Sequence, residues 1–208
     1  MMKSITFWFD PVSPFAYLAF ERLPQALEGC SYVVDYKPLL FAGLMAHWGQ
    51  KGPAEVEPKR AWTFRHVRWL AQQHGIAIDT PAVHPFNPLP LLRLAIACGP
   101  NRRIVEAVMR HAWVGGADAG DADRLAALTQ ALAPARDPAC ADVKQAVRSN
   151  TDEAIGHGVF GVPTFEADGR LFWGLDALPM LRAALLGEPW FDGPAWDDAA
   201  MPRPGVKR

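Results

Sequence analysis

Two short segments near opposite ends of the chain carry residue types that could do chemistry. The first, residues 10–15 (Asp-Pro-Val-Ser-Pro-Phe), closes an apolar run and places Ser13 where a helix is predicted to begin. A hydroxyl at that position, together with the positive end of the helix dipole, can stabilise an anion just outside the helix. Such a hydroxyl cannot carry electrons, but it can hold a thiolate that another molecule brings.

The second segment, residues 161–165 (Gly-Val-Pro-Thr-Phe), predicts a bend into a strand. The bond before Pro163 can be cis, which would turn the amide and carbonyl of Val162 outward for pairing with an extended peptide. Each segment also has an ordinary interpretation, since serine before proline is a common helix cap and many strands begin after a tight turn. The binding interpretation rests on the two segments occurring together in this order.

The composition indicates a folded protein with a small-molecule partner. The chain has 208 residues, half of them apolar, which excludes a disordered chain and suits one core with a large insertion. The formal net charge is -1, so nothing favours nucleic acid or an anionic membrane as a partner. The first nine residues hold too short an apolar run for a signal peptide or a membrane span, which predicts a cytoplasmic protein.

The cysteines and histidines give no sign of a metal site. Cys30, Cys98 and Cys140 lie far apart and form no C-x-x-C pair, and the six histidines show no ligand spacing. We therefore expect neither a bound metal nor an internal redox pair.

The first forty residues predict a βαβ unit. Residues 5–9 form a short apolar run that ends at Asp10 and predicts a buried strand. Residues 15–27 place apolar side chains on one face of a helix, in which Pro24 marks a kink or an early end. Residues 32–36 predict a second strand, reached through the helical crossover.

The middle of the chain, residues 41–156, predicts helices only. Residues 59–74 and 89–98 carry helical apolar patterns that each end at a glycine, and Asp121 is a candidate helix cap. Asp137 followed by a proline predicts that another helix starts directly after it. No strand signal interrupts this stretch, so an all-helical insertion is expected.

Strand patterns return after Gly158. Residues 164–166 and 171–173 flank Asp168 and a glycine, a pair that favours a hairpin turn, and residues 177–186 predict a last helix. The tail that follows contains several prolines and tryptophans without any period, and we expect part of it to dock on the surface.

The order of these elements predicts an α/β fold, a thioredoxin-like sheet (βαβ followed by ββα) interrupted by a large all-helical insertion. In this division, residues 1–40 and 157–187 form a discontinuous thioredoxin-like domain, residues 41–156 form the insertion, and residues 188–208 form a C-terminal tail. Ser13 then stands where a redox cysteine would be.

Four runs of sequence resemble those of the 2-hydroxychromene-2-carboxylate isomerase family. They are residues 7–18 (FWFDPVSPFAYL), 53–60 (PAEVEPKR), 87–90 (NPLP) and 158–165 (GVFGVPTF). This family is related to kappa-class glutathione transferases and to thioredoxin-fold disulfide oxidoreductases with a helical insertion. The resemblance spans about residues 5–186, and its motifs are specific in combination.

The resemblance implies glutathione as the cofactor and Ser13 as the catalytic residue, which holds the glutathione sulfur as a thiolate. It implies that Val162 pairs through its backbone with the cysteinyl part of glutathione and that Asp176 binds the γ-glutamyl amino group. The other residues that it assigns to glutathione are Lys59, Pro163 and Gln50, which stands where relatives carry asparagine. The residues that it assigns to the substrate are Asn87 and Trp62.

Basic side chains at roughly helical spacing follow the second of these runs. For Arg60, Arg65 and Arg68 we expect a solvated helix surface, the usual role of a charged helix face. Lys59 differs from them because the resemblance assigns it to the bound tripeptide.

The resemblance implies a glutathione-dependent isomerase of 2-hydroxychromene-2-carboxylate or a similar aromatic α-keto acid, acting in aromatic compound degradation and working as a homodimer. A kappa-like glutathione transferase and a non-catalytic module that binds a thiol or a peptide remain alternatives. A disulfide oxidoreductase is the least favoured, because Ala16 stands where a resolving cysteine would be needed.

Overall fold

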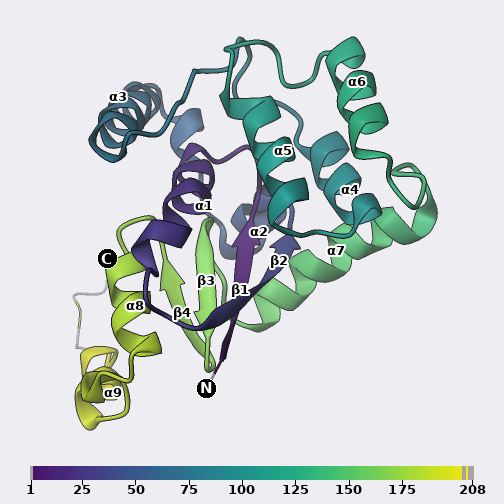
Figure 1. Cartoon of the computed structure of the whole chain (residues 1–208). Helices are drawn as coiled ribbons and strands as arrows, with labels where there is room; N and C mark the ends of the chain where they lie inside the picture. The colour runs from purple at the N-terminus through teal and green to yellow at the C-terminus, as the bar shows by residue number, and fades with distance from the viewer. Residues whose placement is uncertain (1, 203–204, 206–208) are drawn as a thin grey trace.

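Four strands form a mixed sheet in the order β2-β1-β3-β4 (Figure 1). The computed structural model describes residues 2–202 and residue 205. The strands are β1 (Lys3–Phe9), β2 (Tyr32–Pro38), β3 (Thr164–Ala167) and β4 (Arg170–Trp173). β1 and β2 are parallel, whereas β3 is antiparallel to both β1 and β4. This topology confirms the predicted α/β fold with a thioredoxin-like sheet.

Successive side chains of β1 point to opposite faces of the sheet and pack against different residues on each. Phe7 and Phe9 point to one face, where the Phe7 ring stacks on Phe165 of β3 with centroids 4.8 Å apart. Trp8 points to the other face and packs with Leu39. Because neighbouring residues of a strand face opposite sides, both faces of β1 need cover.

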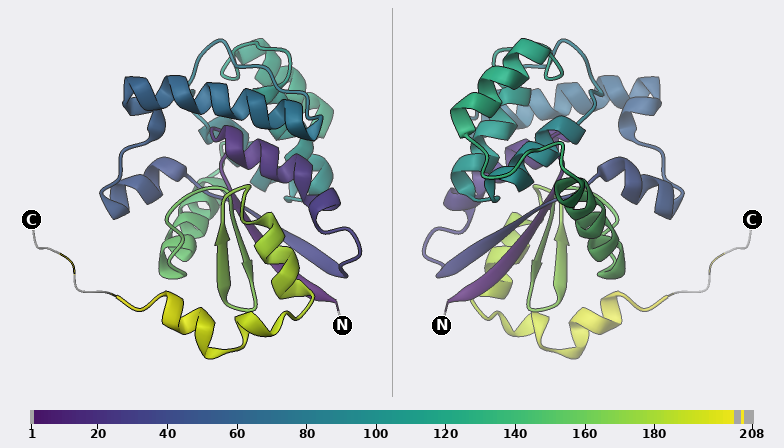
Figure 2. Two further views of the ribbon diagram at one scale, coloured as in Figure 1. Left: turned by 90° about the vertical axis from the view of Figure 1, so that its left-hand side faces the viewer. Right: turned by 90° about the vertical axis from the view of Figure 1, so that its right-hand side faces the viewer.

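Helices supply that cover on both sides. α1 (Pro14–Ala26) and α8 (Leu178–Leu185) lie against one face, and α7 (Ala141–Gly156) lies against the other (Figure 2). Ser13 caps α1, since its side chain accepts a hydrogen bond from the amide of Ala16, and a proline occupies the first helical turn. Pro24 lies inside α1, shortly before the helix ends.

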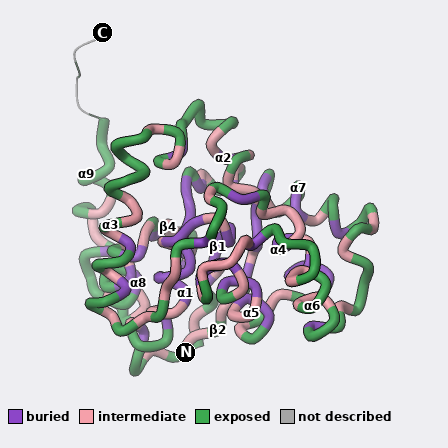
Figure 3. Tube along the Cα trace, turned by 90° about the horizontal axis from the view of Figure 1, so that it is seen from above, coloured by how far each residue is buried: buried purple, intermediate pink, exposed green. Residues whose placement is uncertain are grey.

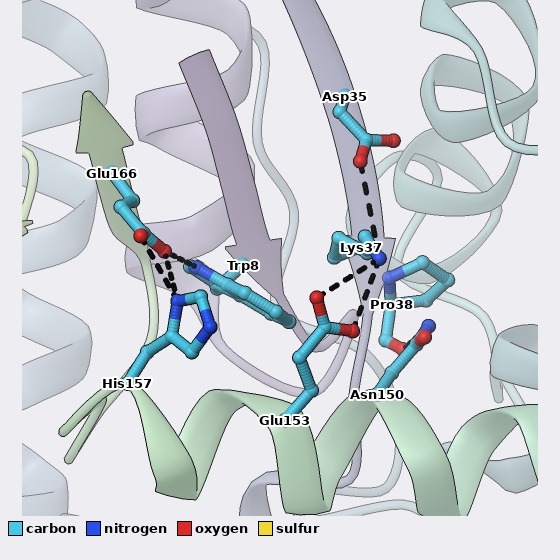
Figure 4. A network of polar contacts seen from close by, with 8 residues as sticks. All are labelled: Trp8, Asp35, Lys37, Pro38, Asn150, Glu153, His157 and Glu166. Atoms are coloured by element: carbon cyan, nitrogen blue, oxygen red, sulfur yellow. Dashed lines mark hydrogen bonds and ion pairs between the residues drawn. The ribbon is translucent and has the colours of Figure 1, made fainter. Parts of the chain in front are cut away.

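Polar contacts fasten α7 and the turn after it to the sheet (Figure 4). Lys37 Nζ lies 3.1 Å from a carboxylate oxygen of Glu153. On β3, Glu166 accepts a hydrogen bond from Trp8 Nε1 at 3.1 Å and lies 2.9 Å from His157 Nδ1. Charged and aromatic groups of three strands therefore hold this helix in place.

Between β2 and β3 the chain forms helices and no strand, as predicted. They are α2 (Phe41–Trp48), the 3₁₀ helix η1 (Pro53–Glu55), α3 (Glu57–His74), α4 (Leu89–Cys98), α5 (Arg102–Trp113), α6 (Ala122–Leu132) and α7. α3 and α4 end at Gly75 and Gly99, both at positive φ, which confirms the predicted stops.

The caps of the last two helices in this stretch differ in how well the sequence predicts them. Asp121 caps α6 by accepting a hydrogen bond from the amide of Arg124, as expected. The helix predicted directly after Asp137 is wrong, because that carboxylate accepts a bond from the amide of Ala139 within a turn and α7 begins at Ala141. An Asp-Pro pair suits a turn as well as a helix start.

The inserted helices share their core with the sheet. Val67 of α3 and Trp113 of α5 belong to the same cluster of buried side chains as Phe7 of β1. Figure 3 shows the buried stretches gathered in the middle of the molecule, whereas α9 (Pro194–Ala199) is exposed. The division into domains at residues 41 and 156 stays a prediction.

The hairpin and part of the tail behave as the sequence predicts. Asp168 and Gly169 both have positive φ, 50° and 74°, at the turn between β3 and β4. After α8 the chain forms η2 (Pro189–Phe191), whose Phe191 is buried with its ring centroid 6.0 Å from that of Phe172. This part of the tail therefore docks. Residues 1, 203–204 and 206–208, which include the end of the predicted tail, lie outside the described residues.

Candidate active site at the start of α1

The structure brings Ser13 next to the bend that precedes β3. Ser13 Oγ donates a hydrogen bond to the carbonyl oxygen of Val162 at 3.4 Å and accepts one from the amide of Ala16 at 3.3 Å. The Val162–Pro163 bond is cis. Ser13 and Val162 are each only 7% exposed. The two chemically suggestive segments therefore form one site.

The backbone of Val162 is partly free to pair with a ligand. Its carbonyl accepts the bond from Ser13, which corrects the expectation that both of its polar groups would be unpaired. Its amide donates no hydrogen bond to any residue within 2–202 or to residue 205. At 3.4 Å the bond from Ser13 is long for an O–H donor. A ligand with an anion for the hydroxyl and an N–H for the carbonyl can replace it.

Two aromatic side chains flank Val162 and were not singled out from the sequence as site residues. The rings of Phe160 and Trp173 have centroids 4.9 Å apart, and Trp173 is 54% exposed. A Cβ atom on Gly161 would lie 2.7 Å from Trp173 Nε1, so this indole can lie here only against a glycine. In the sequence, the aromatic Phe160 directly before Gly161 is the signal that could have indicated an aromatic side chain at this site.

The loop that precedes Ser13 is held by side chains from the inserted helices. Trp113 Nε1 donates a hydrogen bond to the carbonyl of Pro11 at 2.7 Å. His84 Nε2 lies 2.9 Å from the carbonyl of Val12 and must carry the proton, because a carbonyl oxygen only accepts. The Asp10 carboxyl accepts a bond from the amide of Val12 at 2.9 Å. Each of these bonds restricts where Ser13 can point.

Asp10 joins this loop to the start of α2. The side chain is fully buried, and its second oxygen accepts a hydrogen bond from the amide of Phe41 at 2.9 Å. Burial raises the pKa of Asp10 from 3.8 to about 7, and the bonds from the amides of Val12 and Phe41 oppose that rise only in part. Near neutral pH the group is therefore poised between its two charge states.

His84 lies among aromatic rings, and its surroundings disfavour the protonated form. Burial lowers its pKa, the bond to the Val12 carbonyl opposes that change, and the nearby charge of Arg60 adds to it. The rings of Phe64 and Phe86 have centroids 5.1 Å and 6.1 Å from that of the imidazole. His84 Nδ1 is buried and has no hydrogen-bond partner among the described residues.

Two cavities open beside Val162. The first, of about 510 Å³, is called the apolar cavity here and lies among the loop before α1, α2, the start of α3 and residues 84–88. Its apolar walls include Phe15, Phe41, Met45, Phe64, Phe86 and Phe160. The second, of about 760 Å³, is called the basic cavity and lies among α1, α3 and α8. Its basic side chains are Arg22, His66, His74 and Arg182.

Over residues 4–186 the sequence matches the family described as the DSBA-like thioredoxin domain. The chain belongs to this family. The 2-hydroxychromene-2-carboxylate isomerase of Sphingobium xenophagum is 29% identical to it over 195 residues, which cover 89% of this chain and 100% of the relative. Glutathione S-transferase kappa 2 of Caenorhabditis elegans is 27% identical, with 92% of this chain and 95% of the relative covered.

A solved structure agrees with the fold of this DSBA-like chain. A structure of 2-hydroxychromene-2-carboxylate isomerase superposes with a TM-score of 0.77 at 23% identity and covers 95% of this chain and 100% of that one. The resemblance found in the sequence motifs is thereby confirmed. The chain is related to enzymes that are isomerases or kappa-class transferases.

The predicted site residues of this DSBA-like chain fall into three groups. Three of them line the apolar cavity: Ser13, Gln50 and Val162. Val162 also lines the basic cavity, together with Pro163 and Asp176. The remaining three lie outside the lining of both cavities and are exposed: Lys59, Trp62 and Asn87. Their assignments to glutathione and substrate stay predictions.

Arg60, the neighbour of Lys59, lines the apolar cavity instead. The expectation of a merely solvated surface is therefore incomplete for Arg60, although the residue is exposed. Asp176 stands at the entry to α8, where its carboxylate folds back over Gly174, and Gly174 in turn donates a backbone bond to the carbonyl of Pro163 at 2.9 Å. The start of α8 is thus tied directly to the cis proline.

Within residues 2–202 and 205, no cluster of three or more histidine, cysteine, aspartate or glutamate side chains could hold a metal ion. In the same part of the chain, no helix combines the length and the apolar character needed to cross a membrane. Cys30, Cys98 and Cys140 are each partly exposed and form no disulfide.

Proposed function

We propose that this DSBA-like protein is a glutathione-dependent isomerase of 2-hydroxychromene-2-carboxylate or of a similar aromatic α-keto acid. The observation that carries this proposal is the contact between Ser13 Oγ and the carbonyl of Val162 at the wall of an apolar cavity. The hydroxyl at the N-terminus of α1 can bind a thiolate there, and the adjacent backbone of Val162 can pair with the peptide that carries the thiol. The relatives named as isomerases and kappa transferases support the same chemistry.

Ser13 would ionise the thiol of glutathione. The hydroxyl exchanges its long bond to the Val162 carbonyl for a charge-assisted bond to sulfur, and the amide end of α1 adds its positive potential. Both effects favour the thiolate over the thiol and lower the pKa of the bound sulfur. The freed carbonyl and the amide of Val162 then pair with the cysteinyl backbone of the tripeptide, as an added strand would.

The isomerisation uses glutathione as a borrowed nucleophile. The cyclic hemiketal first opens: the bond from C2 to the ring oxygen breaks, the 2-hydroxyl loses its proton to become the α-keto group, and the phenolic oxygen takes up a proton. The thiolate then adds to one carbon of the conjugated double bond, so a C–S bond forms and the electron pair moves onto the α-keto oxygen as an enolate. The former double bond rotates as a single bond. The enolate then expels the thiolate, which restores the double bond with the opposite geometry and consumes no glutathione.

Other residues would position the two ligands. We assign Asp176, at the entry to α8, to the γ-glutamyl amino group, and we assign Gln50 and Lys59 to the remaining parts of the tripeptide. Pro163 shapes the bend that presents Val162. Asn87 and Trp62 keep the substrate roles that the resemblance implies, since a modest shift of an exposed side chain can bring it to a ligand.

A glutathione titration tests the proposal. Wild type should develop thiolate absorbance near neutral pH, Ser13→Ala should lose it, and Ser4→Ala should behave as wild type because Ser4 is an exposed residue of β1. Wild type should then convert the chromene acid with glutathione unconsumed.

Two other outcomes identify the alternatives. A stable glutathione conjugate with loss of free thiol would favour the kappa-like transferase. Proteins named as kappa-class glutathione transferases are similar to this chain. Glutathione binding that is the same in wild type and Ser13→Ala, without a thiolate band in either, would favour a non-catalytic binding module.

The cytoplasmic location and the homodimer are part of the same proposal. Cell fractionation of the source organism tests the location, and light scattering of the purified full chain tests the dimer. A monomer at micromolar concentration would contradict the dimer without affecting the thiol chemistry of Ser13.

A further inference from the structure

We propose that Arg60 anchors the carboxylate of an aromatic acid whose rings occupy the apolar cavity. This inference rests on the proposed function and deepens it, because it names the side chain that recognises the charge of the substrate. Lys59, which the proposed function assigns to the tripeptide, lies outside the lining of this cavity, whereas Arg60 belongs to it.

The cavity suits a flat apolar body. Its volume of about 510 Å³ lies within the range of pockets that enclose small organic ligands, on the order of 300–1,000 Å³. Phe160 and Trp173 line it and remain 37% and 54% exposed, which is a large amount of unburied aromatic surface beside a reactive hydroxyl. Aromatic side chains prefer offset or edge contacts with another ring. An aromatic ligand would provide these contacts.

Charge decides which kind of aromatic ligand fits. Two acidic groups that line the cavity are already engaged with backbone amides: Asp10 with Val12 and Phe41, and Glu55 with Gly52 at 2.6 Å. Neither carboxylate forms an ion pair with a basic side chain within residues 2–202 and 205. The basic groups of the lining therefore remain available to an anionic ligand.

Arg60 is the cation that is best placed for a ligand. It forms no ion pair with any acidic side chain in the part of the chain that the structure describes. It belongs to the first turns of α3, a regular element, whereas Lys51 lies in the irregular segment before η1. A guanidinium presents a planar fork that matches a carboxylate through two parallel hydrogen bonds.

Arg60 is also connected electrostatically to the reactive end of the site. Its charge acts on His84, and His84 donates to the carbonyl of Val12, the residue before Ser13. Because Arg60, Phe160 and Ser13 line the same cavity, a ligand whose carboxylate meets Arg60 can reach the thiol site along the aromatic wall. In the basic cavity, by contrast, Arg22 and Arg182 already contact Gln25 and the carbonyl of Glu28.

Equilibrium binding of two inert probes tests the anchor. The probes are 2-naphthoate and 2-naphthamide, which share the rings and differ in charge, and calorimetry measures their affinity for the full chain. Wild type should prefer the acid, and Arg60→Ala should bind the acid at least about tenfold more weakly while its affinity for the amide stays the same. Arg65→Ala removes the same charge from α3 outside the cavities and should match wild type.

Several results would overturn the anchor. They are equal affinity of wild type for acid and amide, an unchanged preference in Arg60→Ala, and an equal loss in Arg65→Ala. Arg60→Gln, which keeps most of the side-chain length, repeats the measurement if the alanine variant fails to fold. The probes need no turnover, so a wild type that prefers the acid but never forms the glutathione thiolate would contradict the proposed function and leave the anchor standing.

Discussion

The two walls of the candidate site are built in different ways. On the sheet side, Ser13 and residues 161–164 are placed by backbone features: a helix cap, a cis peptide bond and a glycine against an indole. On the side of the insertion, His84 and Trp113 hold the loop through single side-chain bonds. The first wall presents the reactive group, and the second decides where it points and what lies beside it. Changes in the first should abolish thiol chemistry, whereas changes in the second should alter stability and selectivity.

The largest expected effect lies in the sheet-side wall, at Gly161. Gly161→Ala places a Cβ atom 2.7 Å from Trp173 Nε1, so the indole or the Val162 backbone must move. We expect a loss of about 1–3 kcal/mol in the free energy of unfolding, as for other overpacked sites, together with much weaker glutathione binding. Urea denaturation and calorimetry measure the two.

Gly156→Ala is the matched control, because nothing lies within 4 Å of a Cβ atom at this helical glycine. It should leave glutathione binding unchanged. Equal behaviour of the two variants would mean that the contact between Gly161 and Trp173 does not shape the site.

The next effect tests the wall formed by the insertion. Trp113→Phe removes the indole N–H that donates to the carbonyl of Pro11 and leaves that acceptor without its buried partner. The expected cost is about 1–3 kcal/mol in the free energy of unfolding. Turnover should fall while the glutathione thiolate band persists. Trp69→Phe, at an indole that is 56% exposed, should leave both the free energy of unfolding and turnover unchanged. Loss of the thiolate band in Trp113→Phe would show that the two walls do not act separately.

The third prediction concerns Asp10, which connects the two walls by accepting hydrogen bonds from the amides of Val12 and Phe41. Its pKa in the folded protein, about 7, is above the ordinary value of 3.8 because of burial. The folded state therefore binds the proton more tightly than the unfolded state, so the stabilisation is complete below pH 3.8 and is lost as the pH rises toward about 7. A pKa that differs by one between the folded and the unfolded chain corresponds to about 1.4 kcal/mol in the free energy of unfolding.

Urea unfolding across this pH range measures the effect. The stability of wild type should fall with rising pH more steeply than that of Asp10→Asn, which has no proton to lose. His84 is present in both proteins, so the comparison measures the difference that the Asp10 carboxyl makes. Parallel curves for the two proteins would contradict the raised pKa.

The smallest effect is expected far from both walls. Glu153→Gln breaks the ion pair with Lys37 on the α7 side of the sheet (Figure 4), where the two side chains are 41% and 26% exposed. Exposed pairs of this kind contribute less than about 1 kcal/mol. Thermal unfolding should shift little, and the glutathione titration should be unchanged. A changed titration would place this helix in the site.

Much of the first wall could be predicted from local patterns. A serine before a proline after an apolar run, and a proline after Gly-Val, predicted the cap and the bend, because caps and X-Pro bonds depend on neighbouring residues. The sheet topology followed from the order of strands and helices. The start of α7 was missed because an Asp-Pro pair is equally compatible with the turn that the structure contains at Asp137.

The second wall depends on contacts that no local pattern contains. His84 and Trp113 bond to residues 72 and 102 positions away, and nothing in their own segments indicates an acceptor. Lys59 and Arg60 show the same limit on a smaller scale. The resemblance assigned the ligand contact to Lys59 and left Arg60 on a solvated surface, whereas Arg60 is the one that lines the apolar cavity. Adjacent residues of a helix point about 100° apart, so the motif alone does not fix which of the two faces the cavity.

Trp173 belongs to the lining of both cavities. A ligand that displaces this indole when it enters one cavity changes the shape of the other cavity. Binding in the two cavities is therefore energetically linked. Such linkage is reciprocal, and each ligand alters the affinity of the second by the same factor. If a tripeptide and an aromatic acid bind on either side of Trp173, their binding free energies would therefore not be additive. The tryptophan would set the cooperativity between the two ligands.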